Sequence, residues 1–276
     1  FHDERIAAVA GNVKVGNRDN VLTRWQAIEY ITSQNLDRRA YGLLNAITVV
    51  PGAIGAWRLS AVRAVGGYVT DTLAEDMDLT WRLRCADWTI VNETGAIAFT
   101  EAPDTLGALF KQRFRWAYGT LQCLMKHRRA LGRNGVFGKV MLPLVWIFQF
   151  LLQWLAPLVD LQLLIAALST LYTWYWNGTA HGQWMPDPTT LQFLQKTGYF
   201  YALFFATELA SAFYAVKLDK EDKSLLWWLF WQRVVYRQML YCVIWKATWM
   251  ALTGMRQGWN KMARKGSVKI PFPTGD

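Results

Sequence analysis

Cysteine is scarce in this chain of 276 residues. Only Cys85, Cys123 and Cys242 are present, they lie far apart, and none stands at the spacing of a metal-binding motif. This pattern argues against a disulfide framework and a zinc site, and it favours three reduced structural thiols. The sequence also contains no internal repeat and no low-complexity tract.

Charged side chains are scarce as well. They make up 18% of the chain against 53% for hydrophobic residues, and 16 Trp, 11 Tyr and 14 Phe give an aromatic content that is high for a soluble protein. The net charge of +10 admits nucleic acid, an anionic membrane surface or a phosphorylated substrate as partner. Because the basic residues are dispersed and several flank apolar segments, we expect contact with membrane lipids and no binding of nucleic acid.

The start of the sequence lacks a secretory signal peptide, and Phe1 is not an initiator methionine. The first five residues lead directly into the apolar run 6–10, as in the middle of a domain. We therefore expect the chain to be the C-terminal part of a longer protein.

Long apolar runs are absent before about Val136, and residues 1–135 have the pattern of an α/β domain. Strands are predicted at 6–15 (interrupted at Gly11-Asn12), 46–50, 88–91 and 96–100. Helices are predicted at 21–40, from a cap at Ser60 to Gly66-Gly67, at 75–86, and from Asp104 or Thr105 to about Arg129. The alternation predicts the final part of a sheet domain.

Residues 136–253 are predicted to form a membrane region. Apolar runs at 139–155 and 158–176 are separated by Ala156-Pro157, which suggests a tight hairpin between two spans. Further runs lie at 198–216 and 234–252. The sequence therefore predicts four transmembrane helices, followed by a basic tail over 254–276.

The distribution of positive charge conflicts with four spans. With the α/β domain inside, the loop 177–197 would lie inside with one lysine, whereas Lys217, Lys220 and Lys223 would lie outside, against the positive-inside rule. Three spans, with residues 139–155 lying in the interface, would remove the conflict. That alternative would place the C-terminus outside.

Three acids stand close together at Glu75, Asp76 and Asp78, where a loop is predicted to enter a helix. Such a cluster can supply a general base that a neighbouring group holds in place, as glycosyl transfer requires for the attacking hydroxyl. The alternative is purely structural, because acids gather at helix N-termini for capping and dipole reasons.

A second constellation is Gln112-Arg113-Phe114-Arg115-Trp116. On a helix Gln112, Arg115 and Trp116 share one face, where an amide and a guanidinium can hold a diphosphate and an indole can stack on a sugar ring. The alternative is an interfacial helix with arginines reaching toward headgroups.

Glu-Asp followed some 36 residues later by Gln-x-x-Arg-Trp, and then by membrane spans, resembles the family 2 processive glycosyltransferases. This group includes cellulose, chitin and hyaluronan synthases, and the chain is most similar to bacterial poly-β-1,6-N-acetylglucosamine synthase-like proteins. The resemblance implies a GT-A type nucleotide-sugar transferase domain. The resemblance covers nearly the whole chain.

The resemblance assigns roles to single residues. It implies that Asp76 is the general base beside Glu75, although Ala74 stands where the family usually has threonine. Gln112 and Arg115 would bind the donor's diphosphate, and Trp116 would carry the acceptor end of the polymer. The adjacent Arg113 is a further candidate substrate-binding residue. Gly52, in the turn after Val50-Pro51, would line the acceptor site.

The C-terminal segment 258–266 resembles a gating loop over the nucleotide, with Trp259 and Arg264 as its candidate contacts. The alternative is a basic anchor next to the membrane. The family's Mg²⁺ or Mn²⁺ ligands precede this part of the chain, so we expect the metal in the longer protein and no metal site within these residues.

Taken together, these patterns predict inverting, processive transfer of a sugar, N-acetylglucosamine by resemblance, from a UDP-sugar to a growing β-linked exopolysaccharide. The enzyme would be a multi-pass protein of the inner membrane with a cytosolic catalytic domain. Two other interpretations stay open, a non-processive transferase acting on a lipid-linked acceptor and an inactive transporter or scaffold. The sequence does not indicate whether an auxiliary subunit is needed.

Overall fold

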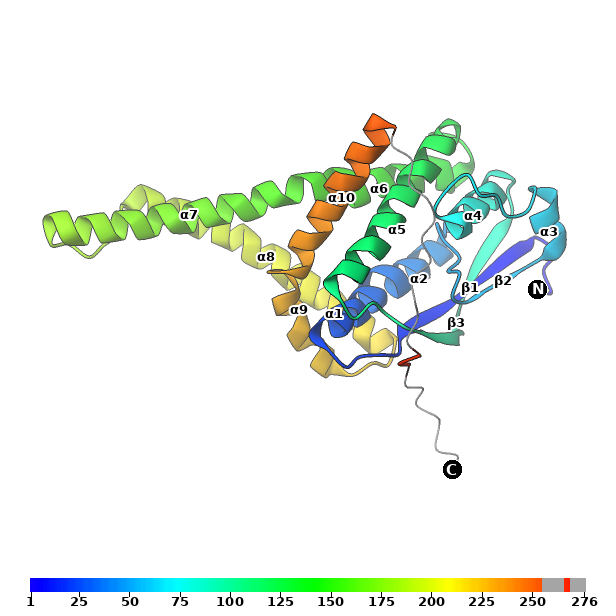
Figure 1. Cartoon of the computed structure of the whole chain (residues 1–276), viewed down its shortest axis with the longest axis horizontal. Helices are drawn as coiled ribbons and strands as arrows, with labels where there is room; N and C mark the ends of the chain where they lie inside the picture. Colours follow the sequence, from blue (N-terminus) through cyan, green and yellow to red (C-terminus); the bar gives the residue numbers. More distant parts are fainter. Residues whose placement is uncertain (255–265, 269–276) are drawn as a thin grey trace, which may run out of the picture.

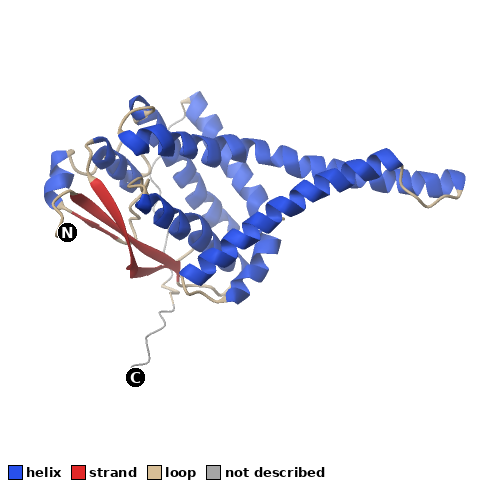
Figure 2. Cartoon of the chain, turned by 180° about the vertical axis from the view of Figure 1, so that it is seen from behind, coloured by secondary structure: helices blue, strands red, loops and turns tan. Residues whose placement is uncertain are grey.

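The computed structural model describes residues 1–254 and 266–268. A three-stranded sheet lies at one end of the molecule, and helices pack beside it (Figure 2). The central strand β1 (Ile6–Val15) pairs antiparallel with β2 (Gly55–Trp57) and parallel with β3 (Thr89–Thr100). The prediction of an α/β domain is confirmed.

The predicted interruption of the first strand is present as an irregularity in its pairing. The register between β1 and β3 shifts between Ala10 and Asn12. A Cβ on Gly11 would lie 2.9 Å from the backbone oxygen of Ala96 and 2.7 Å from Ile54, so the glycine permits a close approach of the neighbouring backbone.

Two strand predictions were wrong in detail. Residues 46–50 are buried but form no strand, because their backbone groups bond to side chains of helix α4 (Glu75–Cys85) instead of a neighbouring strand. The predicted strands 88–91 and 96–100 are one continuous strand, β3. Its parallel pairing with β1 skips residues 93–96, because Ala10 pairs with Asn92 and Asn12 already pairs with Ile97.

The predicted helix at 21–40 forms as three consecutive segments, α1 (Val21–Glu29), the π-helical η1 (Tyr30–Asn35) and α2 (Leu36–Leu43). Asn20 caps it by accepting a hydrogen bond from the Thr23 amide. The short helix α3 (Leu59–Ala64) starts after Arg58, so the predicted cap at Ser60 was wrong. Helix α5 (Leu106–Lys126) starts after Thr105 as predicted, and η2 (Arg128–Ala130) follows it.

The largest correction concerns the predicted hairpin at Ala156-Pro157. Residues Phe137–His181 form one helix of 45 residues, and Pro157 lies inside it. Its consecutive segments are η3 (Phe137–Met141), α6 (Leu142–Trp146), η4 (Ile147–Leu151) and α7 (Leu152–His181). The chain turns at 182–187 instead, because Gly182 takes the left-handed conformation that ends a helix (φ +68°).

After this turn, helix α8 (Pro188–Leu218) runs back beside α7, and the two project away from the sheet (Figure 1). Within the described residues, two helices are long and apolar enough to cross a membrane, Phe137–His181 and Pro188–Leu218. The prediction of about four spans is not confirmed.

The first and last predicted spans pack against the α/β domain. Helix α10 (Tyr236–Thr253) lies along α5, and both share one apolar cluster with the first part of the long helix (Figure 1). Phe137, Met141 and Phe150 of the long helix are buried in this cluster. Only the remainder of the long helix extends beyond the domain. The chain reaches α10 through η5 (Lys223–Leu225) and α9 (Leu226–Gln232).

The loop that follows α8 is fixed to the α/β domain by ion pairs. Glu221 contacts Arg18 at 2.6 Å and Lys14 of β1 at 3.0 Å. Asp219, whose side chain is buried, contacts Arg39 of α2 at 2.5 Å and accepts a hydrogen bond from Asn35 at 2.9 Å. The hairpin of α7 and α8 therefore leaves the domain and returns to it.

Candidate active site

The candidate base Asp76 lies in the first turn of α4, next to Glu75. Its carboxylate accepts hydrogen bonds from the amide of Met77 at 2.8 Å and from the amide of Gly52 at 3.1 Å. The Asp76 side chain is half-buried, whereas Glu75 is exposed. The structure thus brings together three residues that the sequence predicted for the site, Gly52, Glu75 and Asp76.

The surroundings of Asp76 favour its protonated form. Burial raises the pKa of this carboxyl and the charge of Glu75 raises it further, while the hydrogen bonds from Met77 and Gly52 lower it, and the net pKa is raised. A carboxylate with a raised pKa is a stronger base than an exposed aspartate. Asp76 therefore has the properties required to accept a proton from a hydroxyl group.

Helix α4 itself positions the turn that carries Gly52. The Thr80 hydroxyl accepts a hydrogen bond from the Val50 amide at 3.1 Å and donates one to the Asp76 carbonyl at 2.7 Å. The Trp81 indole donates to the Thr48 carbonyl at 2.8 Å. Residues 46–52 consequently run along α4, and their last amide points to the acid.

Helix α5 holds the loop that precedes the acid. A Cβ on Gly119 would lie only 2.8 Å from the Cβ of Ala74, so the loop crosses the helix at this glycine. The Leu73 amide donates to the Gln122 side chain at 2.8 Å, and the Cys123 thiol contacts the Ala74 carbonyl at 3.8 Å. Sequence analysis missed Gly119 and Gln122. A glycine in the middle of a predicted helix was the available signal for a close approach.

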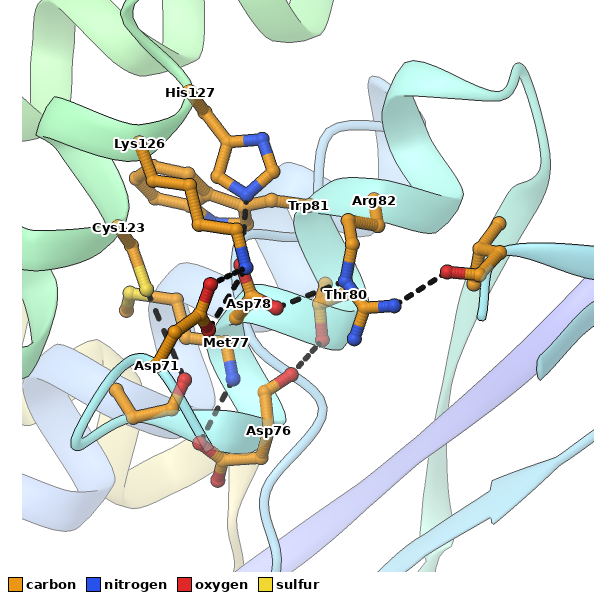
Figure 3. A network of polar contacts seen from close by, with 12 residues as sticks. Asp71, Asp76, Met77, Asp78, Thr80, Trp81, Arg82, Cys123, Lys126 and His127 are labelled. Carbon is orange, nitrogen blue, oxygen red and sulfur yellow. Dashed lines mark hydrogen bonds and ion pairs between the residues drawn. The ribbon is translucent and has the colours of Figure 1, made fainter. Parts of the chain in front are cut away.

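Asp78 faces the opposite way from Asp76 and enters a buried network (Figure 3). It contacts Arg82 at 2.8 Å, Lys126 at 2.9 Å and His127 at 2.9 Å. Burial alone would raise the pKa of Asp78, but the bonds from His127, Lys126 and Arg82 lower it to about 2. Asp78 therefore joins α4 to the end of α5 and stays charged.

Arg113 lies in a buried ion pair. Its guanidinium contacts Glu29 of α1 at 2.6 Å, Tyr236 of α10 at 3.1 Å and the side-chain oxygen of Gln112 at 2.5 Å. Tyr236 also donates a hydrogen bond to Glu29. In the structure Arg113 therefore connects three helices, α1, α5 and α10. A direct contact of Arg113 or Gln112 with a donor stays a prediction.

Trp116 is half-buried on α5, one turn before Gly119. Its ring lies 4.3 Å from the guanidinium carbon of Arg113 and 6.2 Å from the ring of Tyr30. Arg115 is also half-buried. The predicted roles of Arg115 in diphosphate binding and of Trp116 as a sugar platform stay predictions.

Part of the C-terminal segment lies at the carboxyl end of the parallel strands. Glu101, just after β3, accepts a hydrogen bond from the Ser267 hydroxyl at 2.6 Å. Val268 packs against Gly16, just after β1, so closely that a Cβ on this glycine would lie 2.5 Å from the valine. Ligands of open α/β sheets bind at this edge. Trp259 and Arg264, the predicted gating contacts, lie outside the described residues.

No group of three His, Cys, Asp or Glu side chains among residues 1–254 and 266–268 is arranged to hold a metal ion. Asp76 and Asp78 have the Asp-x-Asp spacing, but Asp78 is occupied by Arg82, Lys126 and His127. The residues described here therefore do not fit a Mg²⁺ or Mn²⁺ site. Ligands in a preceding part of the protein stay a prediction.

An α/β domain with a half-buried carboxylate at a helix N-terminus, extended by an apolar helical hairpin, is compatible with the predicted nucleotide-sugar transferase. The model of the family described as glycosyl transferase family group 2 matches residues 1–255. The chain belongs to this family.

Curated relatives include two staphylococcal proteins named poly-β-1,6-N-acetyl-D-glucosamine synthase. The protein from Staphylococcus aureus (strain COL) is 34% identical over 125 residues, which are 45% of this chain and 30% of that protein. The protein from Staphylococcus epidermidis is 34% identical over 122 residues, or 44% and 30% of the two chains. The matched part thus spans less than a third of these relatives' length.

Among solved structures, a mannosyltransferase from Pyrobaculum calidifontis in complex with GDP-Man and Mn²⁺ is similar over 92% of this chain and 56% of its own. The TM-score is 0.49 and the sequence identity is 14%.

Proposed function

We propose that this protein transfers N-acetylglucosamine from a UDP-sugar to the end of a growing β-linked polysaccharide, with inversion at the anomeric carbon. The observation that carries the proposal is the half-buried Asp76 carboxylate, held by the amides of Met77 and Gly52 and given a raised pKa. Membership of the family and 34% identity to the staphylococcal synthases support the reaction and the sugar.

In the proposed reaction, Asp76 removes the proton from the acceptor hydroxyl. The oxygen attacks the anomeric carbon from the face opposite the diphosphate, and the bond from that carbon to the diphosphate breaks. The proton stays on Asp76 and the electron pair leaves with UDP, so no covalent enzyme intermediate forms. Gln112 and Arg115 would bind the diphosphate, and Trp116 would stack on the polymer end.

A divalent metal would offset the charge that develops on the leaving diphosphate. We propose that its ligands lie in a part of the protein that precedes this chain. No step assigned to the residues described here depends on it.

We also propose a membrane arrangement with two spans. The long helix would cross the membrane, the turn at 182–187 would lie on the far side, and α8 would return. The ion pairs of Asp219 and Glu221 with the α/β domain support this arrangement, because they hold the loop after α8 on the side of that domain. Lys217, Lys220 and Lys223 then lie inside, which resolves the conflict with the positive-inside rule.

The test uses the full-length protein in membrane vesicles with UDP-N-acetylglucosamine and Mg²⁺. We expect Asp76→Asn to lower transfer by at least roughly 100-fold, because the amide accepts no proton. Asp71→Asn, the same change at an exposed residue of the preceding loop, is the matched control and keeps most of the activity. Equal activity of Asp76→Asn and wild type would overturn the proposed base.

Product length separates processive from non-processive transfer. Long polymer from the wild-type protein supports processive synthesis. Release of UDP with only a short or lipid-linked product would favour a non-processive transferase. No turnover with any UDP-sugar would leave the transporter or scaffold interpretation.

A further inference from the structure

A pair of aromatic side chains stands on the stretch of chain between Gly52 and Asp76, and the proposed reaction assigns it no role. The rings of Trp57, on the edge strand β2, and Tyr68 are 6.2 Å apart and meet nearly edge to face at 75°. Tyr68 is 56% exposed and Trp57 is partly exposed. Two such rings at the surface leave apolar area open to solvent, and aromatic side chains of this kind commonly line ligand sites.

The backbone before Tyr68 is fixed to the helix that carries Asp76. Arg82 of α4 donates to the carbonyls of Val65 at 2.5 Å and Gly67 at 2.6 Å, and Asp78 holds the same guanidinium at 2.8 Å. The turn at Gly66-Gly67, with φ of +86° and +70°, then leads directly to Tyr68. Tyr68 therefore keeps a fixed position relative to α4.

Trp57 packs against the segment that carries Gly52. A Cβ on Gly55 would lie 3.4 Å from the Trp57 indole nitrogen and 2.6 Å from Val50, so the indole lies close to the segment that leads to Gly52. The Gly52 amide in turn donates to Asp76. Trp57 thus ends the 50–57 segment that carries Gly52, and Tyr68 lies in the loop that Arg82 holds against α4.

The electrostatics agree with this proximity. Burial raises the pKa of the Tyr68 phenol, and the charges of Asp76 and Glu75 raise it further. Glu75 is exposed and can accept hydrogen bonds.

We propose that Trp57 and Tyr68 form a subsite for a sugar ring of the acceptor, which fixes the acceptor hydroxyl beside Asp76. The proposal rests on the proposed function. The apolar face of a pyranose ring presents C–H groups that pack on aromatic faces, while its hydroxyls bond to polar groups at the edge. An aromatic corner with a carboxylate beside it offers both kinds of contact.

The first experiment measures transfer to soluble β-linked N-acetylglucosamine oligomers by the full-length protein in detergent. We expect Tyr68→Ala and Trp57→Ala to raise the KM for the oligomer by roughly tenfold each, in line with the loss of one aromatic packing contact. The affinity for UDP stays at the wild-type value. Tyr68→Phe, which keeps the ring, is the matched control and retains the acceptor KM.

An unchanged acceptor KM in both alanine variants would overturn the subsite. A rise in KM that Tyr68→Phe shares fully would also overturn stacking, since the hydroxyl and not the ring would then be responsible.

A second measurement separates failure of the subsite from failure of the proposed function. Binding of the same oligomers is followed by saturation-transfer NMR without any donor, so that no turnover is needed. Binding that is lost in Tyr68→Ala and kept in Tyr68→Phe supports the subsite even if the wild-type protein transfers no sugar. Equal binding by wild type and Tyr68→Ala contradicts it whatever the reaction proves to be.

Discussion

At the scale of single residues, Asp76 and Asp78 show how one helix turn gives two carboxylates opposite properties. Asp76 is half-buried with only amide donors and has a raised pKa. Asp78 is fully buried, contacts three basic side chains, and has a pKa of about 2. The two positions point to different sides of α4 (Figure 3). The first is suited to take up a proton and the second to stay ionised.

The charge of Glu75 gives a test of this assignment. A base must be deprotonated to act, so kcat/KM falls as the pH drops through the pKa of Asp76. Because Glu75 raises that pKa, Glu75→Gln should move the acid limb of the profile to lower pH. The measurement is kcat/KM against pH for the variant and for Glu4→Gln, an exposed control. An unmoved limb would show that Glu75 does not tune the base.

Asp78 should contribute to stability in a pH-dependent way. Its pKa is lowered from 3.8 to about 2, so its contribution is present above pH 4 and is lost as the pH falls toward 2. The shift corresponds to about 2 kcal/mol. We expect Asp78→Asn to lower the unfolding temperature at pH 7, with a difference from wild type that narrows between pH 5 and 3. A difference that stays constant over this range would contradict the assignment.

At the scale of elements, helix α5 is the support against which the candidate site is built. Its glycine at 119 lets the loop of Leu73 and Ala74 approach, and Gln122 bonds to that loop. At its other end Arg113 joins α5 to α1 and α10 through Glu29 and Tyr236. A movement of α5 would therefore move the acid loop and the apolar helices together.

Gly119→Ala tests this support. The added methyl group would lie 2.8 Å from the Cβ of Ala74 and would push the loop away from α5. We expect kcat to fall about tenfold, because the base shifts relative to the acceptor. Gly107→Ala is the matched control on the same helix, since no atom lies within 4 Å of its added Cβ. Equal kcat in both variants would show that the contact at Gly119 has no influence on the base.

At the scale of the whole molecule, the apolar hairpin leaves the α/β domain and returns to it. The first part of the long helix is buried against α5 and α10, and the loop after α8 is held by Asp219 and Glu221. The 45 residues of the long helix span about 68 Å, roughly twice the thickness of the hydrocarbon core of a bilayer. One helix thus serves both as a domain element and as a candidate membrane span.

The two-span arrangement is tested by labelling single cysteines with a membrane-impermeant maleimide. In a background without the three native cysteines, Met185→Cys, in the turn between the spans, should react in intact cells. Asp222→Cys, in the loop after α8, should react only after the membrane is opened. Both positions are exposed in the structure. Reaction of Asp222→Cys in intact cells, or equal labelling of both, would contradict two spans.

The sequence by itself determined those helices and strand features that depend on neighbouring residues. Periodicity and the cap at Thr105 predicted α5, the cluster of acids predicted the start of α4, and Gly11 predicted the irregularity in β1. The motif spacing also led to the family that the comparison with known proteins confirms. The three local elements depend on side chains close together in the chain, and the family motif depends on residue types at a fixed spacing; a sequence displays both directly.

Only the tertiary structure decided features that depend on contacts between distant segments. The apolar run 46–50 satisfies its backbone with Thr80 and Trp81, so it needs no strand neighbour. Pro157 lies within a helix, and the chain turns after Gly182, whose left-handed conformation ends that helix. The loop after α8 is held against the α/β domain by ion pairs with residues some 200 positions earlier in the chain. Such contacts leave no pattern in the local sequence, because their partners come together only when the chain is folded.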